Sequence, residues 1–179
     1  MDKRMLEKGL VQVYTGNGKG KTTAALGLAF RAVGRELRVC MIQFVKGSEP
    51  CGEHLAATRL APYFTIIQTG HKGWLGRKKP GPEVTACARK AFEMARRAVA
   101  DAEYDLVILD EINTAVSYEL VTVEELLQLI QEKDEHVELV LTGRNAAPEI
   151  MEAADLVTEM REVKHYFKAG VTARIGIEK

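Results

Sequence analysis

The chain has 179 residues, and its 25 Lys and Arg residues balance its 25 Asp and Glu residues, so the formal net charge is zero. Such a balance argues against nucleic acid or an anionic membrane as a partner, since both attract proteins with excess positive charge. The length fits a single domain, residues 1–179, and no apolar run approaches a membrane span. Three scattered cysteines, without a signal-peptide pattern at the start, indicate reduced thiols and a cytoplasmic protein.

The first predicted strand, residues 10–14, leads into the glycine-rich sequence YTGNGKGKTTAA. A glycine-rich loop between a strand and a helix binds phosphate, because its backbone N–H groups and the helix N-terminus point at the anion. Lys21 adds a positive charge there, and the hydroxyl of Thr22 is a suitable ligand for Mg²⁺. The loop departs from the pattern G-x-x-x-x-G-K-[ST], because Thr15 stands where the first glycine is expected and Gly16 follows it. The loop alone leaves open which phosphate it holds.

Helices and strands are predicted to alternate after this loop. A run rich in Ala and Leu predicts a helix over 21–33, with Gly34 at the C′ position. The next predicted elements are a strand over 37–45, a short helix over 53–59 and a strand over 64–68.

Residues 69–82 are rich in Gly, Lys and Pro and are predicted to form an irregular loop. A loop of this length in a compact domain usually serves a function. It contains Trp74, the only tryptophan, which either anchors the loop or lines a pocket for a flat ligand. The basic run at 77–79 is either a solvated charge cluster or a local anion site.

The second half of the chain predicts a buried parallel sheet. The continuous apolar run at 106–109 is typical of a strand covered by helices on both faces. Before it, a helix over 82–100 has one apolar face, formed by Val84, Ala88, Ala91, Phe92, Ala95 and Val99. The later predicted elements are a helix after a capping box at Thr122 and Glu125, a strand over 137–141, a helix over 148–154, and terminal strands over 155–163 and 173–177. The whole pattern predicts an α/β fold, with an open, mostly parallel sheet of the P-loop NTPase type and helices on both faces.

Charged residues follow two of these strands. Asp110 and Glu111 end the run at 106–109, and Arg144 follows the strand over 137–141. Because α/β sheets bind ligands at the carboxyl ends of their strands, the carboxylates can hold Mg²⁺ and the arginine can reach phosphate or ribose. The alternatives are an ordinary strand-end carboxylate and a surface arginine at a turn. No Ser–His–Asp or Cys–His arrangement indicates a protein nucleophile.

Several stretches, in order along nearly the whole chain, together resemble one known family. They are GNGKGKTTAA in the loop, QFVKG at 43–47, Gly52-Glu53, LVILDEI at 106–112, LTGR at 141–144 and the segment 154–177. This set resembles the P-loop-type ATP:corrinoid adenosyltransferases, which act on cob(I)yrinic acid a,c-diamide or cob(I)alamin and whose loop has the same shortened form. The resemblance implies transfer of the 5′-deoxyadenosyl group of ATP to the cobalt of a reduced corrinoid, with release of triphosphate. It also implies that ATP lies in the loop in the reverse direction from most P-loop proteins.

The resemblance implies a role for each matching residue. Catalytic roles fall to Lys21, Glu111 and Arg144, and Mg²⁺ is expected on Thr22, Asp110 and Glu111. The residues expected to contact ATP or the corrinoid are Gly16, Asn17, Gly18, Lys19, Gly20, Lys21, Thr22, Thr23 and Trp74. The expected partners are a second copy of the chain, in a homodimer, and a flavoprotein that transiently supplies electrons to cobalt.

Two features depart from the family pattern. Many members carry a Gly-Phe-Thr-Trp stretch whose aromatic side chains help to displace the lower ligand of cobalt. Here residues 70–74 read Gly-His-Lys-Gly-Trp, so that Trp74 is the aromatic residue of the stretch. The N-terminal arm, residues 1–9, is also short.

Two other functions are compatible with the same residues. A P-loop NTPase or small-molecule kinase would act at the γ-phosphate, with Glu111 orienting water or a hydroxyl acceptor and Arg144 stabilising that phosphate. A regulatory module would bind the nucleotide without turnover. The products formed from ATP and a reduced corrinoid distinguish the three possibilities.

Overall fold

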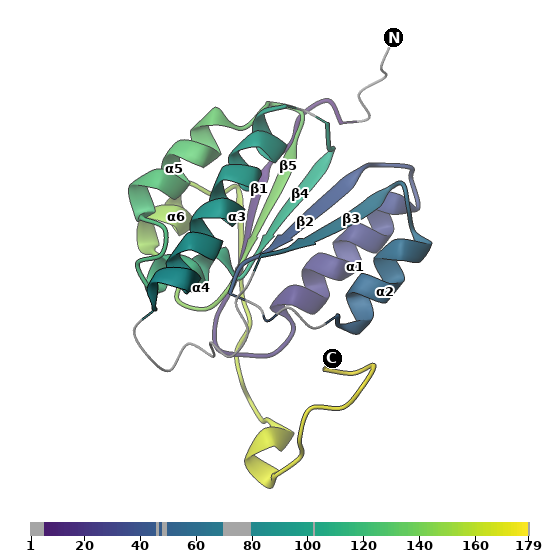
Figure 1. The fold of residues 1–179 in the computed structure, drawn as a ribbon, viewed down its shortest axis with the longest axis vertical. Helices are drawn as coiled ribbons and strands as arrows, with labels where there is room; N and C mark the ends of the chain where they lie inside the picture. The colour runs from purple at the N-terminus through teal and green to yellow at the C-terminus, as the bar shows by residue number, and fades with distance from the viewer. Residues whose placement is uncertain (1–5, 46, 48–49, 70–79, 102, 179) are drawn as a thin grey trace.

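Six strands form one open sheet in the order β3-β2-β4-β5-β1-β6 (Figure 1). The computed structural model describes residues 6–45, 47, 50–69, 80–101 and 103–178. The strands are β1 (Val11–Thr15), β2 (Val39–Gln43), β3 (Phe64–Gln68), β4 (Leu106–Asp110), β5 (Glu138–Thr142) and β6 (Leu156–Glu159). All neighbouring strands pair in parallel, which confirms the predicted α/β sheet. Their carboxyl ends therefore meet at one edge of the sheet.

Helices cover both faces of the sheet, as predicted (Figure 1). One face carries α1 (Lys21–Val33) and α2 (Gly52–Arg59). The opposite face carries α3 (Pro82–Ala100), α4 (Ile112–Ser117), α5 (Val123–Glu132) and α6 (Pro148–Glu152). Across the described ranges, no helix is both long enough and apolar enough to cross a membrane.

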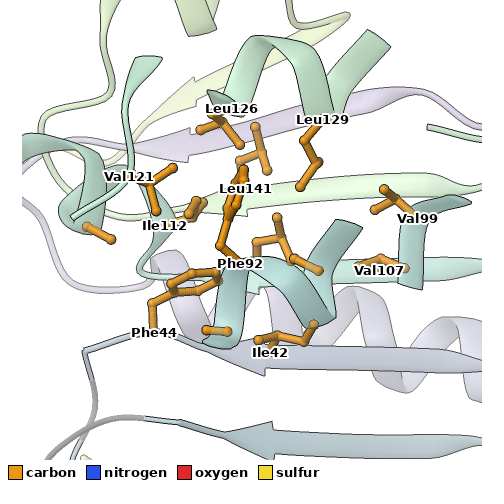
Figure 2. Packing of buried hydrophobic residues seen from close by; sticks show 14 of the residues in the cluster. Ile42, Phe44, Phe92, Val99, Val107, Ile112, Val121, Leu126, Leu129 and Leu141 are labelled. Atoms are coloured by element: carbon orange, nitrogen blue, oxygen red, sulfur yellow. The ribbon is translucent and has the colours of Figure 1, made fainter. Parts of the chain in front are cut away.

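Successive side chains of the central strands enter two separate cores. In β4, Leu106 and Ile108 pack in the core beneath α1 and α2, whereas Val107 and Leu109 pack in the core beneath α3 to α6. Figure 2 shows this second core, where Phe92 of α3 lies among side chains of the sheet, α4 and α5. A strand buried on both faces needs an apolar residue at every position, which is why the run at 106–109 is continuous.

Most predicted elements are confirmed. The bounds of α1, α3 and β3 agree with those predicted, and every residue of the predicted apolar face of α3 is buried. The capping box before α5 is present, because the Thr122 hydroxyl accepts a hydrogen bond from the backbone N–H of Glu125 at 3.2 Å. The prediction for Gly34 is wrong: its φ of −62° is helical, and the residue in the left-handed region is Glu36, with a φ of 62°.

The C-terminal predictions are only partly correct. The strand expected over 155–163 is confined to β6, and the strand expected over 173–177 does not form. Residues Tyr166–Ala169 instead form a 3₁₀ turn, and Arg174 pairs with Glu178 at 3.0 Å within a further turn. The segment after β6 lies beyond the carboxyl edge of the sheet (Figure 1), so it is not placed to add a strand. The short α4 was not predicted, because its six residues carry too little periodic pattern.

Candidate functional site

The glycine-rich loop joins β1 to α1 at the carboxyl edge of the sheet. Gly16 and Gly20 have φ values of 93° and 123°, in the left-handed region that favours glycine. A Cβ at Gly16 would also lie 2.5 Å from the carbonyl oxygen of Met160, which follows β6. Met160 holds the loop by two backbone hydrogen bonds, from its N–H to Thr15 at 2.8 Å and from the N–H of Gly18 to its carbonyl at 2.6 Å. The loop conformation therefore depends on close contact with the end of β6.

The side chain of Lys21 is hydrogen-bonded to the glycine-rich loop. Its Nζ donates hydrogen bonds to the carbonyl oxygens of Gly16 and Gly18, both at 2.7 Å, and the residue is only 6% exposed. Burial lowers the pKa of Lys21 below the ordinary lysine value, and the carboxylate of Glu111 opposes this shift. The cation is thus partly desolvated and held in one position, which are the conditions under which a charge interacts strongly with a ligand of opposite sign.

Asp110 connects the end of β4 to the first turn of α1. Its carboxylate is fully buried and accepts hydrogen bonds from the hydroxyls of Thr22, at 2.9 Å, and Thr142, at 2.7 Å. The amide of Gln43, at the end of β2, lies 3.4 Å from the other carboxylate oxygen. Three strands and the first turn of α1 therefore fix this carboxylate beside the hydroxyl that was predicted to bind metal.

Glu111 occupies an unusual backbone conformation for its residue type. Its φ of 64° is left-handed, and its N–H donates to the Thr142 hydroxyl at 3.0 Å. Its carboxylate accepts a hydrogen bond from the hydroxyl of Thr114 at 2.5 Å. A non-glycine residue in this region costs about 1–3 kcal/mol and persists where surrounding contacts enforce it, often at functional sites. Glu111 also lines the cavity that is described below.

Arg144 reaches the same place from β5. Its backbone N–H donates to the Thr114 hydroxyl at 3.1 Å, so Thr114 links Arg144 to Glu111. Gly143, with a φ of 132°, permits this approach, since a Cβ there would lie 2.7 Å from the backbone nitrogen of Thr114. Burial is the main cause of the lowered pKa of Lys21, and the positive charge of Arg144 adds to it.

A cavity of about 660 Å³ unites most of the predicted site residues, and its volume lies in the range of small-molecule sites. Its lining includes residues 18–23 of the loop together with Glu111 and Arg144. Asp110 does not line this cavity but contacts Thr22, which does, and Gly16 and Asn17 belong to the loop without lining the cavity. Trp74 lies outside the described residues.

The cavity also contains residues to which no role was assigned from the sequence. An apolar wall is formed by Leu26, Phe30, Ala56, Leu60 and Phe64. The C-terminal segment contributes His165, Gly176, Ile177 and Glu178. Phe30 is 71% exposed, and an apolar residue of α1 off its buried face was a signal that could have identified this wall. The segment 154–177 was part of the family resemblance, which was a signal, but its place beside the cavity depends on the fold of the whole chain.

Comparison with known proteins agrees with this geometry. The profile of the family described as ATP:corrinoid adenosyltransferase BtuR/CobO/CobP matches residues 7–178. The corrinoid adenosyltransferase of Escherichia coli K12 is 41% identical over 172 residues, which cover 96% of this chain and 86% of that protein. The chain belongs to this family. Corrinoid adenosyltransferase CobA of Salmonella typhimurium LT2 is 38% identical over 96% of this chain and 86% of its own length, and the Pseudomonas aeruginosa corrinoid adenosyltransferase is 38% identical over 96% and 84%.

Membership in the ATP:corrinoid adenosyltransferase family decides between the functions that the motifs left open. The family consists of enzymes that use ATP and a corrinoid, so a phosphoryl-transferring NTPase or kinase is not favoured. The resemblance inferred from the loop, LVILDEI and LTGR is confirmed. The relatives are named as adenosyltransferases, which are enzymes, so a regulatory module that binds the nucleotide without turnover is not favoured either.

Proposed function

We propose that this chain transfers the 5′-deoxyadenosyl group of ATP to the Co(I) centre of a reduced corrinoid and releases triphosphate. The observation that carries the proposal is one cavity in which the phosphate loop, Glu111 and Arg144 converge, in a chain whose family match spans 7–178. The product serves adenosylcobalamin formation, by synthesis or salvage.

The bond changes need little covalent chemistry from the protein. Co(I) of the corrinoid substrate donates an electron pair to C5′ of ATP, the C5′–O bond breaks, and its electron pair leaves with the triphosphate. The corrinoid itself supplies the nucleophile, so no general base is required. Holding cobalt, C5′ and the leaving oxygen in line can lower the barrier by roughly 7–11 kcal/mol. We propose that Lys21, whose Nζ the loop carbonyls hold, and the loop N–H groups stabilise the charge that develops on the triphosphate.

The oxygen donors beside the loop are of the kind that Mg²⁺ prefers. The Thr22 hydroxyl and the carboxylates of Asp110 and Glu111 are all hard oxygen ligands, and Thr22 already contacts Asp110. We propose that these three residues hold the ion, which neutralises part of the triphosphate charge when bound. We also propose that ATP lies in the reversed direction, so that the loop holds the leaving group and C5′ faces the corrinoid.

We also propose an oligomeric state, a cellular location and an electron donor. A homodimer is supported by apolar side chains left exposed on β6 and the segment after it, such as Val163 at 89% and Ile175 at 93%. A cytoplasmic setting is supported by the three cysteines, all of which are free thiols. Since Co(I) is strongly reducing, we propose a flavoprotein as the transient electron donor. Trp74 is proposed to contact the corrinoid from the loop at 69–82.

The test is an anaerobic assay with ATP, Mg²⁺ and chemically reduced corrinoid, in which both products are identified. Adenosylated corrinoid and triphosphate in equal amounts are expected. ADP and phosphate as the dominant products would contradict the proposal, and unchanged ATP under these conditions would support a regulatory module.

A further inference from the structure

Three side chains with metal-binding chemistry gather where α2 begins. The ligand atoms of Cys51, Glu53 and His54 all lie within 4.8 Å of one another. A thiolate, a carboxylate and an imidazole are the donor types that zinc takes from proteins, whereas Mg²⁺ prefers oxygen alone. We propose that Cys51, Glu53 and His54 form a binding site for a divalent cation of borderline softness, such as Zn²⁺.

The start of α2 brings two of these donors together. Cys51 is the N-cap: its side chain accepts from the backbone N–H of His54, and the His54 Nδ1 accepts from the backbone N–H of Cys51 at 3.1 Å. This reciprocal arrangement is a capping box, for which Ser or Thr and Glu or Gln are the usual residues. Cysteine and histidine serve the cap less well but are strong ligands for soft and borderline cations. Cysteine and histidine at these two positions are therefore better explained by cation binding than by helix capping.

His54 can accept a cation at small cost. Its Nε2 is shielded from solvent and has no hydrogen-bond partner among the described residues. In the neutral ring the Nδ1 that accepts from Cys51 carries the lone pair, and Nε2 carries the proton. Ligation through Nδ1 therefore exchanges one hydrogen bond for a metal bond and leaves the surroundings of Nε2 unchanged.

Glu53 is oriented by a buried neighbour. The Gln43 amide, fully buried at the end of β2, donates to Glu53 Oε1 at 3.2 Å and also approaches Asp110. Metal ligands are commonly held by such outer hydrogen bonds, which fix their direction. Three protein donors leave one tetrahedral position for water, as in open zinc sites. Because Asp110 and Thr22 offer only oxygen, this cation site is chemically distinct from the proposed Mg²⁺ site.

The test uses Cd²⁺, because bonding between thiolate and Cd²⁺ produces an ultraviolet charge-transfer absorption that reports the sulfur ligand directly. The full chain is titrated in excess Mg²⁺, which occupies the oxygen sites. The ligand variants are Cys51→Ser and His54→Gln, and the matched controls are Cys87→Ser, in α3, and His136→Gln, far from α2. Serine is a preferred N-cap, so Cys51→Ser retains α2 while removing the thiolate.

One equivalent of Cd²⁺ with the thiolate absorption is expected for the wild type and both controls. Cys51→Ser should lose the absorption, and His54→Gln should bind at least about tenfold more weakly. No thiolate absorption in the wild type, or its persistence in Cys51→Ser, would overturn the proposal. So would equal affinities for His54→Gln and His136→Gln. The readout does not involve adenosyl transfer, so it stands or falls independently of the proposed reaction.

Discussion

At the scale of single residues, the site depends on side chains whose partners come from distant parts of the chain. The sequence was sufficient to identify Lys21, Thr22, Asp110, Glu111 and Arg144, because loops and strand ends have recognisable patterns. It could not predict that the Thr142 and Thr114 hydroxyls would connect Asp110, Glu111 and Arg144. Threonine is common at strand ends. Only the parallel register of β4 and β5 shows that Thr142 lies beside the end of β4.

Lys21→Ala should remove turnover while leaving the fold intact. The variant loses the cation beside the triphosphate, and one preorganised donor of this kind contributes about 10²–10³ in kcat. Lys133→Ala is the matched control, since Lys133 Nζ also donates to backbone carbonyls, of Gly9, Asp134 and Val137, but at the opposite edge of the sheet. It should lower the melting temperature and retain kcat. Comparable kcat losses in the two variants would show that Lys21 acts only by supporting the fold.

The affinity for ATP should fall at alkaline pH because of Lys21. Burial lowers the Lys21 pKa below 10.5, so in the free enzyme the ammonium loses its proton earlier than an ordinary lysine does. Bound triphosphate favours the charged form, so affinity is highest below this pKa and declines as pH rises through it. Isothermal titration of wild type and Lys21→Met across this range measures the effect. Parallel pH profiles for the two proteins would contradict it.

At the scale of elements, prediction succeeded where pattern and packing agree. The bounds of α1 follow from its run of Ala and Leu, and those of α3 from Pro82 and apolar periodicity; α3 also buries the face predicted for it. Predictions of secondary structure failed where the local sequence pattern is weak. The six residues of α4 contain little pattern, and the apolar residues near 175 resemble a strand although their side chains are exposed and their chain turns back on itself.

Two glycine substitutions should change stability in opposite directions. Gly143→Ala places a Cβ about 2.7 Å from the Thr114 backbone at a φ of 132°, so it should destabilise the protein and disturb the contacts of Glu111 and Arg144. Gly27→Ala, within α1 with nothing within 4 Å of the new Cβ, should stabilise by about 0.5–1 kcal/mol. Chemical denaturation of both variants measures the effects. A stabilised Gly143→Ala would mean that the turn after β5 can relax.

At the scale of the whole molecule, the site is completed by the end of the chain. Met160 holds the phosphate loop, and His165, Gly176, Ile177 and Glu178 line the cavity, although β6 and the segment after it are exposed. The sequence predicted terminal strands in this segment but gave it no place at the site. Such a role could not be predicted locally, since β6 is last in the chain yet pairs with the first strand.

Deleting residues 165–179 should therefore weaken ATP binding without unfolding the domain. The deleted side chains lie outside both cores, so the melting temperature should change little. ATP affinity should fall because one side of the cavity is lost, whereas the loop keeps its contact with Met160. Equilibrium binding of ATP to the truncated and full chains is the measurement. Equal affinities would show that the C-terminal segment borders the nucleotide site without contributing to it.

The central claim is that the loop holds the leaving group and that the bond at the 5′ carbon breaks. The most direct measurement uses ATP labelled with ¹⁸O at the oxygen between C5′ and the α-phosphorus, incubated anaerobically with the enzyme and reduced corrinoid. Cleavage at C5′ places the label in free triphosphate and leaves the adenosyl group on cobalt without it. Recovery of the label in ADP, with unlabelled phosphate released from the γ end, would contradict the claim.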